Sequence, residues 1–279
     1  MLVFPKAKIN LGLRITGKRT DGYHDIETVM YPVGLCDALE LVPAHESAVD
    51  ILTVTGITLT GRIEENIVLG AVKALRKTHS FPFLKIHLHK IIPAGAGLGG
   101  GSSDAGSILR AINKMFSLAL GADELKGIAA GLGSDCPFFI DCKPAYATGR
   151  GEILTPVVNV LDGFYAVLLN PGISVSTKEA YENCLPVSRE RSLKEIIEIP
   201  VHEWKDLIVN DFERTVFLAH PEIKAIKEAL YRSGAVYSSM SGSGSTVYGI
   251  FKKKPEIHAA LRKYLICEGI FQSISAQSK

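Results

Sequence analysis

The chain lacks several features that would place it in a broad class at once. No apolar run reaches the roughly 18 residues that span a bilayer, and no basic-then-apolar signal opens the sequence. The five cysteines are odd in number and have no CxxC spacing, which argues against a disulfide framework or a zinc site. These absences favour a cytoplasmic protein with reduced thiols, without a membrane partner and without assigned metal ligands.

The chain also has little net charge, because 31 Lys and Arg residues face 29 Asp and Glu residues for a balance of +2. A nucleic-acid-binding surface needs a broad basic field, and the short run Lys252–Lys254 does not supply one. We therefore expect no nucleic-acid partner. A length of 279 residues commonly divides into two domains, which we expect at 1–155 and 156–279.

Glycine, by contrast, is abundant and concentrated in one loop. Five glycines fall within positions 95–101, and apolar residues then recur at helical spacing from Ala105 to Phe116. Glycine accepts positive φ, so successive N–H groups can converge on an anion at the positive end of that helix. The run predicts a phosphate-binding loop, with Ser102 or Ser103 capping the helix. Its residues are Pro93, Ala94, Gly95, Ala96, Gly97, Leu98, Gly99, Gly100, Gly101, Ser102 and Ser103.

Known nucleotide-binding motifs fit this loop poorly. Gly95-x-Gly97-x-x-Gly100 matches the dinucleotide fingerprint, but that motif follows a strand buried on both faces. The segment 84–89 alternates apolar and polar residues, which predicts a strand with one buried face. No Gly-Lys-Ser/Thr closes the run, and HRD and DFG are absent, which excludes a Walker A loop and a protein kinase. A structural glycine turn remains the alternative.

Three further segments carry polar groups in suggestive places. Alternation around Ile9–Ile15 predicts a half-buried strand with Lys8 and Asn10 on its non-core face, although Lys8 could be an ordinary solvated lysine. Asp135 lies between a glycine turn and an apolar run, where it is either a reagent or, with Ser134, a helix cap. The segment 238–245 is typical of a hairpin turn.

Taken in order, these segments resemble the GHMP small-molecule kinases over nearly the whole chain. The resemblance implies an α+β fold, with a ribosomal-S5-like first GHMP kinase domain and a ferredoxin-like second one. Ala-Lys-x-Asn followed by Gly-Tyr-His resembles the members that phosphorylate the 2-hydroxyl of a cytidine diphosphate methylerythritol. Lys6 departs from the family, which usually has proline directly before Ala-Lys. The segments that carry the resemblance are 7–11, 21–24, 65–68, the glycine loop, 133–139, 170–172 and 240–245.

The resemblance implies the reaction and its catalytic groups. ATP is the co-substrate, its phosphates lie on the glycine loop, and Mg²⁺ is expected with them. Asp135 acts as general base toward the alcohol, and Lys8 stabilises the developing alkoxide. Whether Ser102 or Ser103 binds a phosphate oxygen or the metal ion stays open.

The resemblance also implies how the two substrates are held. Tyr23 and Tyr181 enclose the cytosine ring and His24 hydrogen-bonds its edge, with Asn10 on the same substrate side. Asn66, which opens a helix, and Lys90, just before the loop, are candidates for the adenine side of ATP. A helix cap and a solvated charge are the respective alternatives for them.

Other functions remain open on the sequence alone. A non-catalytic nucleotide sensor could use the same loop, and an S5-like RNA-binding module would need a basic patch that the charge balance does not provide. The alternative enzyme is a GHMP kinase that acts on homoserine or mevalonate. We expect a monomer or weak homodimer whose partners are two small molecules, ATP and the cytidine diphosphate methylerythritol.

Overall fold

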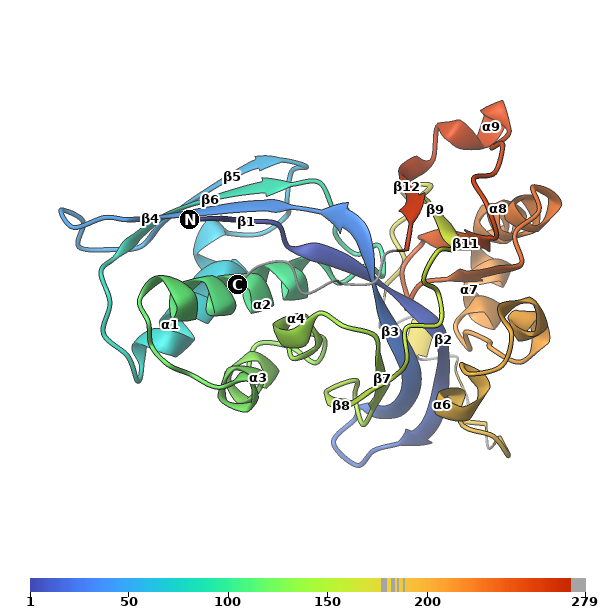
Figure 1. The fold of residues 1–279 in the computed structure, drawn as a ribbon, viewed down its shortest axis with the longest axis horizontal. Helices are drawn as coiled ribbons and strands as arrows, with labels where there is room; N and C mark the ends of the chain where they lie inside the picture. Colours follow the sequence, from blue (N-terminus) through green and yellow to red (C-terminus); the bar gives the residue numbers. More distant parts are fainter. Residues whose placement is uncertain (177–179, 182–183, 185, 188, 272–279) are drawn as a thin grey trace. The chain divides into compact units, whose positions relative to one another are not determined.

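The computed structural model describes residues 1–176, 180, 181, 184, 186, 187 and 189–271. These residues form two compact units, each built from several stretches of the chain (Figure 1). The first unit contains Met1–Ala7, Leu35–Ala94 and Gly99–Cys142, and the second contains Lys8–Gly34, Gly95–Leu98 and the chain from Lys143 onward. These units group residues by their contacts and not by continuous stretches of chain. The division of the sequence into domains 1–155 and 156–279 stays a prediction.

The first unit is a four-stranded sheet with helices on one face (Figure 1). The strand order is β1-β4-β6-β5, with β4 antiparallel and β5 parallel to β6. Alternation along β6 puts its even-numbered residues on the buried face, as the sequence predicts. The strands are β1 (Leu2–Val3), β4 (Ala38–Pro43), β5 (Ile51–Gly56) and β6 (Leu84–Lys90). The helices are η1 (Ile63–Glu65), α1 (Ile67–Arg76), α2 (Gly100–Met115), α3 (Ala122–Ala130) and α4 (Phe138–Asp141).

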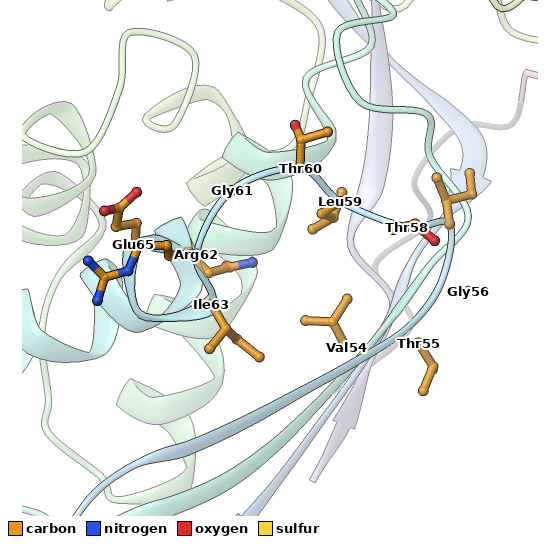
Figure 2. A pocket seen from close by; sticks show the side chains of 12 residues that line it. Val54, Thr55, Gly56, Thr58, Leu59, Thr60, Gly61, Arg62, Ile63 and Glu65 are labelled. Carbon is orange, nitrogen blue, oxygen red and sulfur yellow. The ribbon is translucent and has the colours of Figure 1, made fainter.

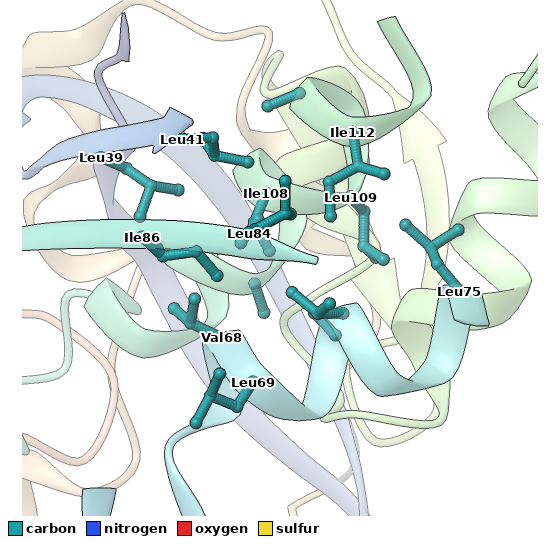
Figure 3. Close-up of a cluster of buried hydrophobic side chains, with 14 of the residues drawn as sticks. Leu39, Leu41, Val68, Leu69, Leu75, Leu84, Ile86, Ile108, Leu109 and Ile112 are labelled. Atoms are coloured by element: carbon teal, nitrogen blue, oxygen red, sulfur yellow. The ribbon is translucent and has the colours of Figure 1, made fainter. Parts of the chain in front are cut away.

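The core of the first unit lies between the sheet and helices α1 and α2 (Figure 3). Leu39, Leu41 and Ile86 of the sheet pack with apolar residues that recur every three or four positions along the two helices. Burying each such side chain contributes about 1.5–3 kcal/mol, which makes this layer the main stabilising element of the unit. The helix contribution comes from Val68, Val72, Leu75, Ile108, Leu109 and Ile112.

The second unit contains two further four-stranded sheets, in the orders β2-β3-β7-β8 and β10-β11-β9-β12. Apolar residues of β9 and β11 pack with Ile223, Ile226 and Leu230 of α8 in its core. The strands are β2 (Lys6–Lys18), β3 (His24–Cys36), β7 (Ala145–Thr148), β8 (Ile153–Pro156), β9 (Tyr165–Leu169), β10 (Tyr237–Met240), β11 (Val247–Phe251) and β12 (Leu265–Ile270). The helices are α6 (Leu193–Ile196), η2 (Val201–Asp206), α7 (Glu213–Ala219), α8 (Pro221–Arg232) and α9 (Ala259–Arg262).

These elements confirm the α+β class and several local predictions. The alternating strand before the glycine loop is β6, the helix after the loop is α2, and the serine-rich segment turns between antiparallel β10 and β11. Within the described ranges, no helix is long and apolar enough to cross a membrane.

The prediction that the second strand is half-buried is wrong. Lys8, Asn10 and Arg14 are only 2–3% exposed, so both faces of β2 are covered. Segments distant in the sequence supply partners for the buried polar groups: Arg14 Nη1 donates to Arg191 O (2.7 Å), and the Tyr248 hydroxyl donates to the backbone oxygen of Asn10 (2.8 Å). Polar groups are buried at low cost when such partners exist.

Both predicted serine or aspartate helix caps are also wrong. Helix α2 begins at Gly100, and its N-cap is Gly99 with φ of +68°, so Ser102 and Ser103 lie inside the first turn. The Ser103 hydroxyl donates instead to Lys6 O at 2.7 Å. Helix α4 begins at Phe138 with Pro137 as N-cap and no side-chain cap, so Asp135 does not serve that purpose. A left-handed glycine satisfies the turn into α2 without a hydroxyl.

Candidate functional site

The glycine loop has a backbone that only glycine adopts without strain. Gly95, Gly97 and Gly99 have φ of +67°, +79° and +68°, alternating with residues of ordinary conformation. A Cβ on Gly97 would lie 1.9 Å from Ser241 O and 3.1 Å from Gly244 N, so a larger residue would displace the backbone. Alternation of left- and right-handed residues is the geometry in which successive amides face an anion. The loop therefore has a backbone compatible with an anion site, and it packs directly on the β10–β11 turn.

Lys8 is held beside this loop within the second unit. Its backbone N–H donates to Leu98 O at 3.0 Å, and its Nζ donates to Asn10 Oδ1. Asn10 is in turn oriented by Thr28, whose Oγ1 accepts from Asn10 Nδ2 at 3.0 Å. The ammonium is only 3% exposed and has a defined position, which an ordinary solvated lysine lacks. The solvated interpretation of Lys8 is wrong.

Ser241 links the same strand to the loop. The Asn10 backbone N–H donates to Ser241 Oγ at 3.2 Å, and that hydroxyl donates to Gly97 O at 2.8 Å. A single side chain from the β10–β11 turn therefore bridges β2 and the glycine loop. The sequence placed Ser241 in a hairpin turn and in a segment of the family resemblance, but nothing local signals this bridge.

Asp135 belongs to the first unit and lies in the turn between α3 and α4, where its side chain is half-buried. Its neighbour Cys136 is fully buried. Burial raises the pKa of the Cys136 thiol to about 11, although a hydrogen bond with Ser102 acts in the opposite direction. The Asp135 carboxylate thus sits at the partly open edge of an otherwise apolar segment. That place suits a group that meets a ligand.

The side chains around the loop supply few ligands for a metal ion, so they fit an ion that is bound mainly by the phosphates of a substrate. Ser103 is buried and engaged with Lys6 O, and Ser102 bonds to Cys136. Among the residues that the structure describes, no three His, Cys, Asp or Glu side chains gather into a metal-binding group. Mg²⁺ typically keeps several waters and binds through substrate phosphates, which agrees with this donor set.

A pocket of about 460 Å³ opens at the end of β5 (Figure 2). Val54, Leu59 and Ile63 line it together with threonine side chains, so it offers both apolar and polar contacts. Asn66 lines the pocket and caps α1, since its Oδ1 accepts from Val68 N at 2.9 Å. The helix-cap interpretation of Asn66 is confirmed. Sequence reasoning found Asn66 but missed the rest of the lining: Thr55, Gly56, Ile57, Thr58, Thr60, Gly61, Arg62 and Glu65.

An aromatic group gathers two of the residues predicted to read cytosine. The rings of His24 and Tyr181 stack at 5.0 Å, and Phe212 meets Tyr181 edge-on at 4.8 Å. Tyr23 is 56% exposed, and the guanidinium of Arg150 lies 5.1 Å from the centre of its ring. The structure therefore brings His24 and Tyr181 together, and it pairs Tyr23 with an arginine that the sequence did not single out.

The alternative interpretation of Lys90 as a solvated charge is wrong. Its side chain is 3% exposed, and its ammonium bonds to the carboxylates of Asp37 and Asp104. Neither aspartate was a sequence candidate. The alternation of β6 carries the only signal, because it places Lys90 on the core face.

Two family models match the chain. The model of the GHMP kinases N terminal domain matches residues 66–142, and the GHMP kinases C terminal model matches residues 192–267. The chain belongs to the GHMP kinase family. A curated relative from Parabacteroides distasonis, named 4-diphosphocytidyl-2-C-methyl-D-erythritol kinase, is 50% identical over 253 residues that cover 91% of this chain and 92% of the relative.

Solved structures of the family agree with this assignment. A crystal structure of 4-(cytidine 5'-diphospho)-2C-methyl-D-erythritol kinase matches with a TM-score of 0.78 and 31% identity, covering 95% of this chain and 96% of the other. The Methanococcus jannaschii mevalonate kinase matches with a TM-score of 0.66 over 94% of this chain and 92% of its own, but at 12% identity. That second likeness shows the shared fold alone. Together the matches confirm the GHMP kinase fold.

Proposed function

We propose that this chain transfers the γ-phosphoryl group of ATP to the 2-hydroxyl of 4-(cytidine 5'-diphospho)-2-C-methyl-D-erythritol. The observation that carries the proposal is the hydrogen-bonded assembly of Lys8, Asn10 and the glycine loop, since phosphoryl transfer needs a fixed cation next to the phosphate site. The 50% identity with a relative of that name favours this substrate. The mevalonate kinases with matching structures, by comparison, are 12%, 14% and 17% identical and share the fold alone.

ATP is held by two features of the chain. The positive-φ glycines and the N-terminus of the 16-residue helix α2 supply amides and a dipole for its phosphates. The pocket at the end of β5 suits the adenine ring, because it combines apolar walls with the carboxamide of Asn66. Mg²⁺ accompanies the phosphates and neutralises charge on them when bound.

Asp135 accepts the proton of the attacking hydroxyl, and Lys8 stabilises the negative charge that develops on the alcohol oxygen and the transferred group. The surroundings of each side chain fit its task. The Asp135 carboxylate is half-buried, and the Lys8 ammonium is held by Asn10.

The aromatic group selects the base of the acceptor. His24 offers hydrogen bonds to the edge of cytosine, and the faces of Tyr23 and Tyr181 offer stacking. The stacking of His24 on Tyr181 supports this assignment, because it places an edge-reading group next to a face-reading one. Asn10 completes the acceptor side through its contact with Lys8.

The test is a coupled ADP-release assay that offers the cytidine diphosphate substrate, homoserine and mevalonate in parallel. We expect selective turnover of the cytidine compound and loss of about 10²–10⁴ in kcat for Asp135→Asn. Asp141→Asn, at an exposed carboxylate of the same segment, is the matched control and should keep the native rate. Preference for mevalonate or homoserine would refute the substrate, and a native rate in Asp135→Asn would refute the base.

We infer a cytoplasmic enzyme that acts as a monomer or weak homodimer and has no nucleic-acid partner. None of the five cysteines forms a disulfide, which suits a reducing compartment, and the net charge of +2 offers no field for a polyanion.

A further inference from the structure

The two ends of the glycine loop are joined by a buried ion pair within the first unit. Lys90 is the last residue of β6, directly before the loop, and Asp104 lies in the first turns of α2, directly after it. Lys90 Nζ is 2.8 Å from Asp104 Oδ2, and the two side chains are 3% and 2% exposed. The pair therefore closes the chain segment 91–103 at its base.

Asp37 adds a second tie at the loop entry. This residue connects β3 and β4, its side chain is fully buried, and it forms an ion pair with Lys90. Its Oδ1 also accepts from the backbone N–H groups of Ile91 and Ile92, the latter at 2.9 Å. The two residues that lead into the loop thus hydrogen-bond to the same carboxylate that neutralises Lys90.

The end of the loop touches the same cluster. A Cβ on Gly100 would lie 2.9 Å from Ile92 Cγ2 and 3.3 Å from Lys90 Nζ. The start of α2 is therefore packed against the ammonium and the loop entry with no room for a side chain. Any movement of Lys90 would shift both ends of the loop.

Folding stability alone does not explain why these three charged groups are buried together. It holds two carboxylates and one ammonium, and Oδ1 of Asp104 has no hydrogen-bond partner among the described residues. Burial raises the pKa of Asp104 to about 7 despite the attraction of Lys90. Apolar residues of similar volume often replace buried ion pairs without loss of stability. A cluster with this energetic cost at the base of a ligand loop indicates a role in the loop geometry.

We propose that Lys90, Asp37 and Asp104 are positioning residues that hold the glycine loop in the geometry that binds ATP. Lys90 acts through the loop, since its ammonium is taken up by two carboxylates, and it need not touch the nucleotide. Preorganised amides stabilise an anion only when they are fixed to within about 0.5 Å. The inference rests on the proposed binding of ATP phosphates by this loop.

The experiment compares Asp104→Ala, which removes the tie, with Asp104→Asn, which keeps an oxygen acceptor for Lys90. The dissociation constant of a non-hydrolysable ATP analogue with Mg²⁺ is measured by calorimetry, alongside KM for the acceptor and the thermal midpoint. We expect Asp104→Ala to weaken analogue binding about tenfold or more and Asp104→Asn to change it less than about threefold, with KM for the acceptor unchanged. Asp123→Ala, at a fully exposed carboxylate on α3, is the control.

A second pair of variants separates positioning from direct contact. Lys90→Met and the double variant Lys90→Met/Asp104→Ala should weaken analogue binding by similar factors, because Lys90→Met already breaks the ion pair with Asp104 and removing Asp104 as well breaks no further one. If Lys90→Met weakens binding while Asp104→Ala binds normally, Lys90 contacts the nucleotide directly and the proposal fails. Lys85→Met, on the exposed face of the same strand, is the control for the lysine.

The remaining outcomes also decide the proposal. If Asp104→Ala lowers the thermal midpoint but its folded fraction binds the analogue normally, the cluster is structural and the proposal is wrong. Asp104→Ser provides a second variant if the alanine variant does not fold, and failure of both to fold would equally overturn the proposal. Wild-type protein that binds the analogue but does not turn over the cytidine compound would refute the proposed substrate alone.

Discussion

Strands β2 and β6 show the same alternation of apolar and polar residues in the sequence. They differ in the burial of the polar residues, which are mostly covered in β2 and mostly exposed in β6. In β6 the polar side chains Lys85, His87 and His89 are exposed, as a strand with one buried face requires. In β2 the polar residues Lys8, Asn10 and Arg14 are as buried as the apolar residues between them. A period of two therefore identifies which residues share a face, but it does not reveal what covers that face.

The difference points to function. A buried polar side chain needs partners, and the ones on β2 have them on the same strand and on other segments of the chain. Asn10 bonds to Thr28 and Ser241, and Lys8 bonds to Asn10 and Leu98. On β6, Thr55 Oγ1 lies 2.8 Å from His87 Nε2 and 2.9 Å from His89 Nδ1 at the exposed surface. Of these two polar faces, the one on β2 lies next to the glycine loop.

The largest expected effect separates the lysines of these two strands. Lys8→Ala should lower kcat by about 10³-fold or more, because the fixed positive charge next to the phosphate site is lost. Lys85→Ala, on the exposed face of β6, should keep the native rate. The coupled ADP-release assay measures both, and equal rates for the two variants would break the comparison.

The second prediction concerns the one polar residue of β6 that faces the core, Lys90, through its partner Asp104. Because burial raises the pKa of Asp104 from 3.8 to about 7, the folded protein binds a proton there more tightly than the unfolded chain. The unfolding free energy of the wild type, relative to Asp104→Asn, should therefore fall as pH rises from about 4 to about 7 and stay level above. The change is at most about 4 kcal/mol, at about 1.4 kcal/mol for each pKa unit.

Urea denaturation of both proteins at a series of pH values measures this difference. A difference that does not vary with pH would show that Asp104 keeps its ordinary pKa in the folded protein. A difference that rises with pH would mean that the ion pair with Lys90 outweighs burial.

The third prediction tests how much the hydrogen bonds of Asn10, which hold Lys8 in place, contribute to folding stability. Asn10→Ala leaves Lys8 Nζ and Thr28 Oγ1 without their shared partner, so it should lower the unfolding free energy by about 1–3 kcal/mol. His89→Ala, which removes an exposed hydrogen bond from β6, is the matched control. Chemical denaturation at one pH compares the two variants, and equal losses would mean that burial of the β2 face adds nothing.

The smallest effect is expected on the outer face of β6. His87→Ala should change the unfolding free energy by less than about 0.5 kcal/mol, because the side chain and its bond to Thr55 are solvent-exposed. A loss above about 1 kcal/mol in thermal or urea unfolding would show that this face is covered in solution.

Much of the fold could be predicted from local pattern. Periodicity found β6 and α2, since each buries a regular stripe of apolar residues. Glycine content found the loop, because its positive φ values exclude other residues. The predicted caps of α2 and α4 were wrong, since serine, aspartate and glycine compete for a helix start and local sequence does not rank them reliably.

The candidate site could be predicted only in part. Lys8, Asn10 and the loop residues stand in motifs, so they were found as residues, while their contacts came from Ser241, Thr28 and Tyr248. Asp37 and Asp104 stand in no motif that was recognised. Their pairing with Lys90 spans 53 and 14 positions, which no local pattern records.

By itself, the sequence determined which residues share a face of a strand or helix and where the backbone must be glycine, because both follow from local geometry. It also determined the family, because the order of its motifs covers nearly the whole chain. The tertiary structure decided which polar faces are buried and which charges pair, because burial and electrostatics depend on segments that are distant in sequence and close in space. Lys8 and Lys90 could each have been an ordinary surface lysine, and packing made one a candidate catalytic group and the other part of the base of the loop.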